Sequence, residues 1–187
     1  MTPPPLPGNT QVISRTQQWL ASFVIEYNIC PFAKREVENN RVQYVVDPEE
    51  DIESCLRMLI EACDFLENHP DVETALVIYP AGFRDFLDFL DYLDLANELL
   101  IVQGYEGIFQ LASFHPDYCF SETEPEDPSN YTNRSPWPML HVIREASLEN
   151  ALAHYPEPEK IPERNIGLTR ELGQPFLQQL LEALRKA

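Results

Sequence analysis

The segment from Thr74 to Tyr79, TALVIY, is a continuous apolar run between two turn sequences, His69-Pro70 and Pro80-Ala81-Gly82. A short apolar run between such turns is typical of a β-strand that is covered on both of its faces. The chain must therefore supply packing elements for both sides of a sheet. With 187 residues, it is long enough to bury such a core without metal or disulfide crosslinks.

Segments with helical periodicity and segments with strand character alternate along the chain on either side of this run. This alternation predicts an α/β sandwich with right-handed crossovers and a mostly parallel sheet of about four strands, packed by helices. The last strand follows a long loop and is expected to pair antiparallel. Strands are predicted at residues 41–46, 74–79, 108–114 and 139–144, and helices at 10–27, 49–67, 83–102, 147–154 and 172–184.

Proline is frequent in this chain, with 17 residues against only 6 glycines, and it marks the tail and the loops. Residues 1–9 are predicted to be a disordered proline-rich tail, and residues 10–187 to form a single α/β domain. Residues 117–137 form a polar stretch that is longer than most loops in compact domains. Such loops are usually functional or disordered, so we expect functional residues in and near this one.

The charge of the chain disfavours several classes of partner. Asp and Glu number 31 against 13 Lys and Arg, a net charge of −18 that repels nucleic acid and anionic membrane surfaces. No apolar stretch is long enough to span a bilayer, and the N-terminus lacks the features of a signal peptide. The 4 cysteines form no CxxC pair, and Cys55 and Cys63 suit the core side of a helix, so we expect reduced thiols and a cytoplasmic protein.

Scarce cationic and nucleophilic residues gather near the predicted ends of the third and fourth strands. If those strands pair antiparallel, His115 at the end of one and His141 in the other become neighbours, and the loop between them closes over both. Arginine binds carboxylates and phosphates, while histidine and cysteine supply acid–base and nucleophilic groups. The predicted catalytic residues are Cys30, His115 and His141, and the predicted ligand-binding residues are Arg134, Arg144, Asn133, Lys34 and Arg35.

Each of these side chains also has a structural interpretation. His115 and His141 are equally consistent with strand-capping or core histidines, and Arg144 with an ion pair to Glu145. Cys30 comes after a predicted helix, without the N-terminal dipole that lowers a thiol pKa, although two cationic residues follow it. A buried, unreactive thiol therefore remains an alternative at this position.

Metal binding is a further alternative around the same loop. Five positions carry residue types that are ordinary zinc or iron ligands, but their spacing matches no compact ligand motif. No metal is therefore assigned, and the cofactor stays undetermined. The five positions are His115, Asp117, Cys119, His141 and Glu145.

Three segments of the chain form a specific signature when they are taken together. They are CPFAKRE at Cys30–Glu36, FHPDYCF at Phe114–Phe120 and NRSPWPMLHVIRE at Asn133–Glu145. In these segments the chain resembles a bacterial family catalogued as domain of unknown function 1415, and the likeness covers most of the chain from the first helix onward. The resemblance implies a bacterial cytoplasmic setting and carries no activity, cofactor or catalytic residue with it.

The residues themselves favour an enzyme that acts on a small anionic metabolite bearing a carboxylate or a phosphate. In this hypothesis Arg134 and Arg144 hold the anion, while the two histidines exchange protons and Cys30 is the nucleophile. One alternative is a noncatalytic module that senses an anion in the same pocket. Another is an interaction protein, in which the acidic surface and the FLDFLDYLDL helix dock on a basic partner or on a second copy as a homodimer.

Overall fold

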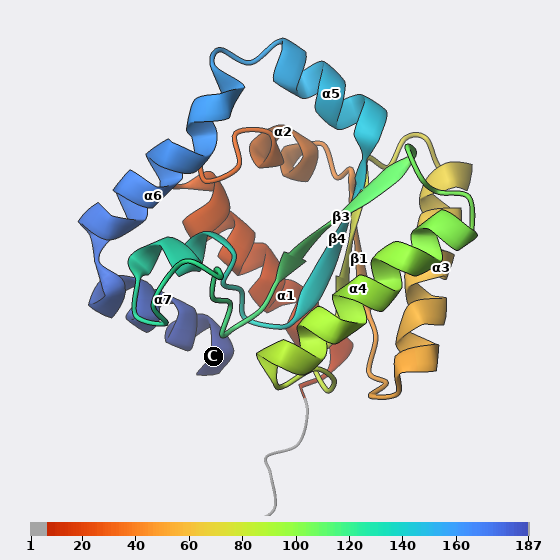
Figure 1. Ribbon diagram of the computed structural model, residues 1–187, viewed down its shortest axis with the longest axis horizontal. Helices are drawn as coiled ribbons and strands as arrows, with labels where there is room; N and C mark the ends of the chain where they lie inside the picture. The colour runs from red at the N-terminus through yellow and green to blue at the C-terminus, as the bar shows by residue number, and fades with distance from the viewer. Residues whose placement is uncertain (1–6, 187) are drawn as a thin grey trace, which may run out of the picture.

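Two layers of helices enclose a four-stranded sheet in the computed structural model, which describes residues 7–186 (Figure 1). Most of the predicted proline-rich tail lies outside the described residues, and the first helix starts at Asn9. All four strands lie within one residue of their predicted bounds at each end. They are β1 (Val42–Val46), β2 (Thr74–Ile78), β3 (Phe109–Phe114) and β4 (Met139–Arg144).

The order of the strands across the sheet is β1-β2-β4-β3, so the last strand in the sequence is inserted between β2 and β3. β1 and β2 run parallel, whereas β4 is antiparallel to both of its neighbours. The expectation of a mostly parallel sheet is therefore wrong, although a single strand does run against the other three. Insertion of that strand replaces one parallel pair by two antiparallel pairs, and the sheet is mixed.

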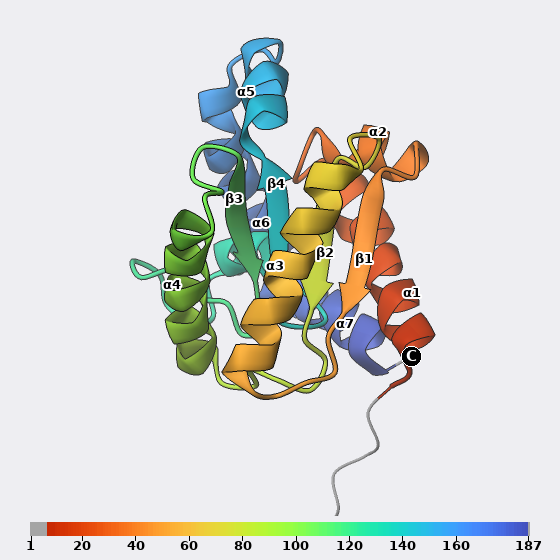
Figure 2. The ribbon, with the colours of Figure 1, turned by 90° about the vertical axis from the view of Figure 1, so that its right-hand side faces the viewer.

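Helices α3 (Ile52–Asn68) and α4 (Phe86–Val102) cover one face of the sheet (Figure 2). Each leads from one strand to another strand farther along the sheet in the same direction, and a common crossover handedness places both helices on the same face. The carboxylates of Asp51 and Asp85 cap these helices by accepting hydrogen bonds from first-turn amides. Buried side chains between these helices and the sheet form the first core, which includes Leu59, Leu66, Val77, Phe89, Tyr92 and Val142.

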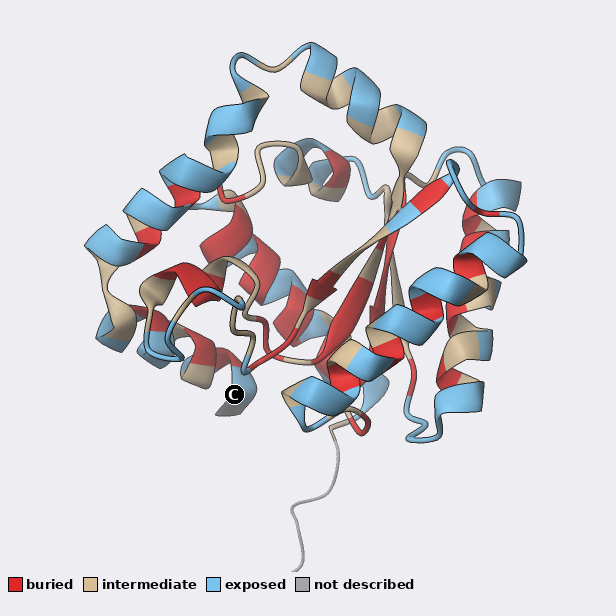
Figure 3. Cartoon of the chain, viewed as in Figure 1, coloured by how far each residue is buried: buried red, intermediate tan, exposed pale blue. Residues whose placement is uncertain are grey.

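The opposite face of the sheet is covered by helices from both ends of the chain. α1 (Asn9–Trp19) continues into a π-helix, η1 (Leu20–Ile25), so the predicted helix is present but is not a uniform α-helix. α6 (Ile161–Leu172) and α7 (Gln174–Lys186) come from the C-terminal end. Figure 3 shows buried residues on both sides of the sheet, and the second core includes Trp19, Phe23, Leu76, Ile78, Met139 and Leu177.

Two helices differ from the sequence-based expectation. α2 (Ala33–Glu38) is too short to show helical periodicity, and no element is predicted there. α6 begins at the end of the segment interpreted as a proline-rich linker, which runs to Pro162, and continues through residues 163–171, where no element is predicted. Its proline lies at the start of the helix, where proline is tolerated. The remaining short elements are η2 (Pro128–Thr132), α5 (Glu145–Ala153) and η3 (Pro158–Lys160).

No helix within residues 7–186 combines the length and the apolar content that crossing a membrane requires. The longest described helices, α3 and α4, have 17 residues each and carry acidic side chains on their outer sides. Both are packing elements of the sandwich.

The packing of the first core predicts that truncation of a buried leucine lowers the free energy of unfolding more than truncation of an exposed one. Leu59 on α3 is fully buried, whereas Leu87 on the outer side of α4 is 69% exposed. We expect Leu59→Ala to lower the free energy of unfolding by about 2–5 kcal/mol because it leaves a cavity, and Leu87→Ala to change it by less than about 0.5 kcal/mol. Urea denaturation followed by circular dichroism measures both values, and equal effects would contradict the packing of α3 on the sheet.

Candidate functional site

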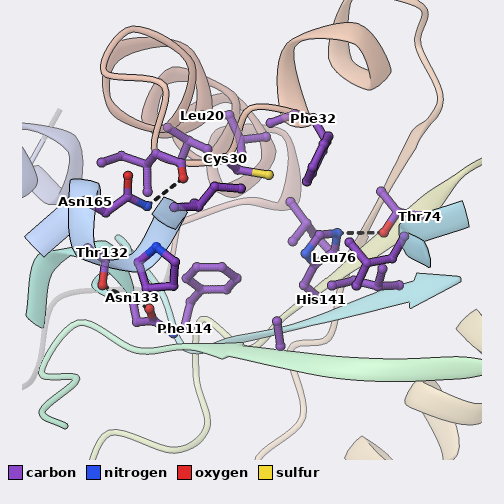
Figure 4. Close-up of a pocket in the computed structure, with 18 of the residues that line it drawn as sticks. Leu20, Cys30, Phe32, Thr74, Leu76, Phe114, Thr132, Asn133, His141 and Asn165 are labelled. Carbon is purple, nitrogen blue, oxygen red and sulfur yellow. Dashed lines mark hydrogen bonds between the residues drawn. The ribbon is translucent and has the colours of Figure 1, made fainter. Parts of the chain in front are cut away.

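A cavity of about 800 Å³ lies between the second face of the sheet and the helices that cover it (Figure 4). The sheet forms its floor, and its walls come from η1, α2, α5, α6 and the loop that follows β3. Most of the lining is apolar, with a few polar side chains among it. A concave, mostly apolar cavity of this size is typical of small-molecule sites, and we call it the pocket.

The floor of the pocket follows from the two-residue repeat of the strands. His141 on β4 pairs with Leu76 on β2 and with Ala112 on β3, and all three residues line the pocket. The alternate residues, such as Val77 and Val142, point into the first core. Insertion of β4 between β2 and β3 therefore places a histidine near the middle of an apolar floor.

The imidazole of His141 is held in one tautomer by Thr74. Nε2 of His141 lies 2.6 Å from Oγ1 of Thr74, and this hydroxyl also donates its proton to the carbonyl oxygen of Val142. Since the hydroxyl has only one proton, it must accept the second hydrogen bond, and Nε2 of the imidazole carries the proton. The neutral ring then presents Nδ1 as a free acceptor, and within the described residues this atom has no hydrogen-bond partner.

Burial lowers the pKa of His141 from its usual value to about 4. A charged imidazolium at this position would be kept from water among apolar side chains, which disfavours the protonated form. The imidazole is therefore neutral near pH 7. It offers the pocket a hydrogen-bond acceptor and no positive charge.

Cys30 reaches the pocket from the wall opposite the sheet, in the connection between η1 and α2 (Figure 4). Contrary to expectation, a helix does begin shortly after it, and the backbone amides of Phe32 and Ala33 act to lower the pKa of its thiol. Burial nevertheless raises the pKa of the Cys30 thiol by more than these amides and the charge of Arg164 lower it. The side chain is therefore a protonated thiol near pH 7.

The connection that carries Cys30 is anchored to α6. Nδ2 of Asn165 donates to the carbonyl oxygen of Ile29 at 2.8 Å, and the guanidinium of Arg164 donates to the carbonyl oxygen of Asn28. Asn28 has a φ of 52°, in the left-handed region that asparagine tolerates better than most residues. The C-terminal part of the chain thus holds the Cys30 wall in place.

Half of the sequence-predicted site residues line the pocket, namely Cys30, Arg35, Asn133 and His141. Asn133 follows η2 and donates to the carbonyl oxygen of Ser113 at 3.1 Å, which ties the loop to β3. Lys34 is not part of the lining. Its exposed ammonium group lies 3.8 Å from the carboxylate of Glu38 on the same helix.

His115 and His141 point to opposite faces of the sheet, so the expectation that they are neighbours is wrong. β3 and β4 do pair antiparallel, but His141 pairs with Ala112, and His115 comes three residues after Ala112. Because successive side chains alternate between the faces of a sheet, the two histidines point to opposite faces. The ring of His115 is buried against two phenylalanines of α4, and burial lowers its pKa. Its Nδ1 accepts from the amide of Asp117 at 3.0 Å, and its Nε2 therefore donates to the carbonyl oxygen of Phe83 at 2.8 Å.

Arg134 and Arg144 lie outside the pocket, so the expectation that they share a site with His141 is also wrong. Arg134 donates to the carbonyl oxygens of Tyr118, at 3.0 Å, and Pro125, at 2.8 Å. Arg144 donates to the carbonyl oxygen of Leu66 in the last turn of α3 and to those of His69 and Val72 in the connection to β2. Both guanidinium groups hold loops together.

The arginines of the pocket lining are paired with carboxylates rather than free. The lining contains two arginines and three glutamates, namely Arg35, Arg170, Glu36, Glu73 and Glu122. Arg35 contacts the carboxylate of Glu36 at 2.6 Å, and Arg170 contacts that of Asp127 at 2.8 Å. Both lining arginines are thus neutralised, and the lining as a whole carries more negative than positive groups.

Across residues 7–186, no group of three or more histidine, cysteine or carboxylate side chains is arranged to hold a metal ion. Two of the ligands considered from the sequence, His115 and His141, lie on different faces of the sheet. The polar chemistry of the pocket is instead that of a neutral imidazole and a thiol.

Sequence reasoning missed Thr74 and Asn165. Thr74 belongs to the apolar run TALVIY, and the two-residue repeat that places Leu76 on the second face would have placed Thr74 there as well. Asn165 and Thr169 are buried polar residues one helical turn apart, in a segment for which no element is predicted. Their spacing is a helical signal that the neighbouring prolines obscure.

A family model described as a protein of unknown function, DUF1415, matches residues 11–179. This range contains all four strands and every residue that lines the pocket. Neither the search of curated proteins nor the search of solved structures found a match.

The low pKa of His141 predicts a pH dependence of stability. In the unfolded chain a histidine has a pKa of about 6.5, so between that value and about 4 the unfolded state binds the proton and the folded state does not. The stability of the fold is therefore highest above pH 6.5 and falls as the pH is lowered toward 4. We expect this loss of unfolding free energy between pH 7 and pH 4.5, measured by urea denaturation, to be smaller in His141→Gln.

The exposed His154 provides the matched control. His154→Gln should retain the pH dependence of the natural chain. A His141→Gln variant with the same pH dependence as the natural chain would contradict the neutral state of His141 in the folded protein.

The contacts of Arg144 predict a structural role. Its replacement by leucine leaves the carbonyl oxygens of Leu66 at the end of α3 and of Val72 before β2 without their charged donor. We expect Arg144→Leu to lower the free energy of unfolding by roughly 2–4 kcal/mol, because hydrogen bonds to charged groups are worth more than neutral ones. Arg84→Leu, at an exposed position, should change it by less than about 0.5 kcal/mol. Equal values in urea denaturation would disprove the role of Arg144.

Proposed function

The chain belongs to the DUF1415 family of proteins of unknown function, and from its own geometry we propose that it is a small-molecule-binding protein. Its ligand is neutral and largely apolar, and it donates one hydrogen bond to Nδ1 of His141. The pocket of about 800 Å³ is the observation that carries this proposal. It has the size and the apolar lining of ordinary ligand sites, with one fixed polar group in its floor.

The charge of the lining supports a neutral ligand over the anionic metabolite expected from the sequence. An anion needs a free positive group, and the lining arginines, Arg35 and Arg170, are already paired with carboxylates. A chain with a net charge of −18 also repels anions at long range. An anionic ligand remains the alternative that the experiment below tests.

The hydrogen bond to His141 supplies specificity. Nδ1 is an acceptor in an apolar environment, so a ligand that covers it without donating a proton leaves a buried polar atom unpaired. Such a mismatch costs about 1–3 kcal/mol. Hydroxyl and N–H groups therefore distinguish ligands from purely apolar molecules of similar shape.

Catalysis at the same pocket is the second candidate function, because Cys30 and His141 both line it. The thiol of Cys30 is protonated and needs an acceptor before it becomes a strong nucleophile. Nδ1 of His141 is a free base in the same pocket. Turnover of a bound ligand that Cys30→Ala abolishes, while binding persists, would establish this function in place of simple binding.

The setting that we propose is a bacterial cytoplasm, as the family resemblance implies. Its support in the structure is that Cys30, Cys55, Cys63 and Cys119 are all free thiols, which persist in reducing compartments. Self-association through the outer side of α4, where Leu87 is exposed, remains a prediction from the sequence.

Two related fluorescent probes test the proposed function. N-Phenyl-1-naphthylamine is neutral and has one N–H donor, and 1-anilinonaphthalene-8-sulfonate has the same rings with a negative charge. We expect the neutral probe to bind at least about tenfold more tightly, as measured by fluorescence titration, because no cation of the lining is free to receive the sulfonate. His141→Leu should weaken binding of the neutral probe by about three- to tenfold through loss of one hydrogen bond.

A pair of alanine-to-leucine variants locates the binding site. Ala112→Leu fills the pocket beside His141 and should abolish binding, whereas Ala146→Leu, at an exposed position of α5, should not. Tighter binding of the sulfonated probe would overturn the neutral ligand in favour of an anion. Binding of neither probe, or binding that Ala112→Leu leaves unchanged, would overturn the proposed function.

A further inference from the structure

We propose that residues 145–162, which we call the strap, form a lid that opens and closes over the pocket. The strap consists of α5, the connection to η3, and the start of α6, and Figure 1 shows it arching from the end of β4 above α2. It contributes Leu148, Ala151 and Ile161 to the lining of the pocket. The inference rests on the proposed function for its purpose, but the geometry of the strap stands by itself.

The two ends of the strap are fixed to the body of the protein by arginines. Just before it, Arg144 donates hydrogen bonds to three carbonyl oxygens in the last turn of α3 and in the connection that follows it. Just after it, Arg164 donates to the carbonyl oxygen of Asn28, and Asn165 to that of Ile29. Motion of the strap is therefore confined to the residues between these anchors.

The middle of the strap is held only weakly. No residue from 145 to 162 is buried, whereas Asn165 directly beyond it is. Its lining side chains are only partly buried because they face the pocket rather than packed side chains. Segments with so little buried apolar surface open at a small free-energy cost compared with global unfolding.

A single aromatic contact fastens the strap to the opposite wall. The ring of Tyr155 meets that of Phe32 edge to face, with centroids 5.6 Å apart. An aromatic pair of this kind stabilises the closed position of the strap beyond the effect of the apolar area that it buries. Pro156 and Pro158, which follow Tyr155 closely, restrict the backbone beside this contact.

Opening of the strap at this contact exposes Cys30. Phe32 and Cys30 belong to the same wall of the pocket (Figure 4), and they are two residues apart in the sequence. The thiol of Cys30 is therefore a natural reporter of the open state. Cys63, which is fully buried in the first core on the other face of the sheet, reports global unfolding instead.

The rate at which N-ethylmaleimide labels each cysteine tests the lid without any ligand. Labelling at a constant pH, with peptide mapping by mass spectrometry, gives separate rates for Cys30 and Cys63 in one sample. When the lid closes faster than the reagent reacts, the rate at Cys30 follows the population of the open state. We expect Tyr155→Ala to raise that rate by about three- to tenfold and to leave Cys63 unchanged, because one aromatic pair is lost.

Two further variants separate the lid from general loosening of the fold. Tyr155→Phe keeps the ring and should label at the natural rate. His69→Ala removes another exposed ring, which stacks on Phe65 of α3 at 4.0 Å on the other face of the sheet, and should leave the rate at Cys30 unchanged. A rise at Cys63 that matches the rise at Cys30 would show unfolding rather than lid motion.

The lid is overturned if Tyr155→Ala labels Cys30 at the natural rate, or if Cys30 of the natural chain reacts as fast as a free thiol. It is also overturned if Cys30 and Cys63 react in step in every variant. Failure of the proposed function is distinguishable from these results, since it appears as an absence of probe binding while Cys30 alone responds to Tyr155→Ala.

Discussion

The antiparallel insertion of β4 between β2 and β3 is the constraint on which the rest of this structure depends. It gives His141 a partner strand on each side, with Leu76 on one and Ala112 on the other. It also brings Thr74 of β2 within hydrogen-bond distance of the imidazole, which fixes the tautomer. A parallel β2–β3 pair in its place would have left the fourth strand at an edge, and the one acceptor in the floor of the pocket would not lie at its middle.

Several of the few cations of this chain hold its loops and connections. Prolines lack an N–H group, and a chain with 17 of them has many loop carbonyls without a backbone donor nearby. Arg134 and Arg144 supply such donors from their side chains, each to more than one carbonyl oxygen. The clustering of arginine near unusual loops is therefore a property of the loops themselves. It leaves the pocket without a free positive charge and makes an apolar, neutral ligand the best match to its lining.

Much of the fold could be predicted from periodicity, because strands and long amphipathic helices leave repeats in a single sequence. The four strands, α3 and α4 were all predicted in this way, whereas α2 is too short and α6 is obscured by prolines. The site could likewise be predicted only in part. Cys30 and His141 were found by residue type and do line one pocket, but His115 was assigned to the wrong face. The register of the β3–β4 pair decides which of their residues point to the same face of the sheet, and no local pattern in either strand specifies that register.

The sequence by itself determined the alternation of strands and helices, the two apolar faces of β2, the unpaired cysteines and the strong negative charge, since each is a property of local pattern or composition. Only the tertiary structure decided the position of β4, the separation of the two histidines, the pairing of each lining arginine and the existence of the pocket. The physical reason is that these depend on contacts between residues far apart in the chain. Whether Nδ1 of His141 is free, for example, is decided by a hydroxyl 67 residues away in the sequence.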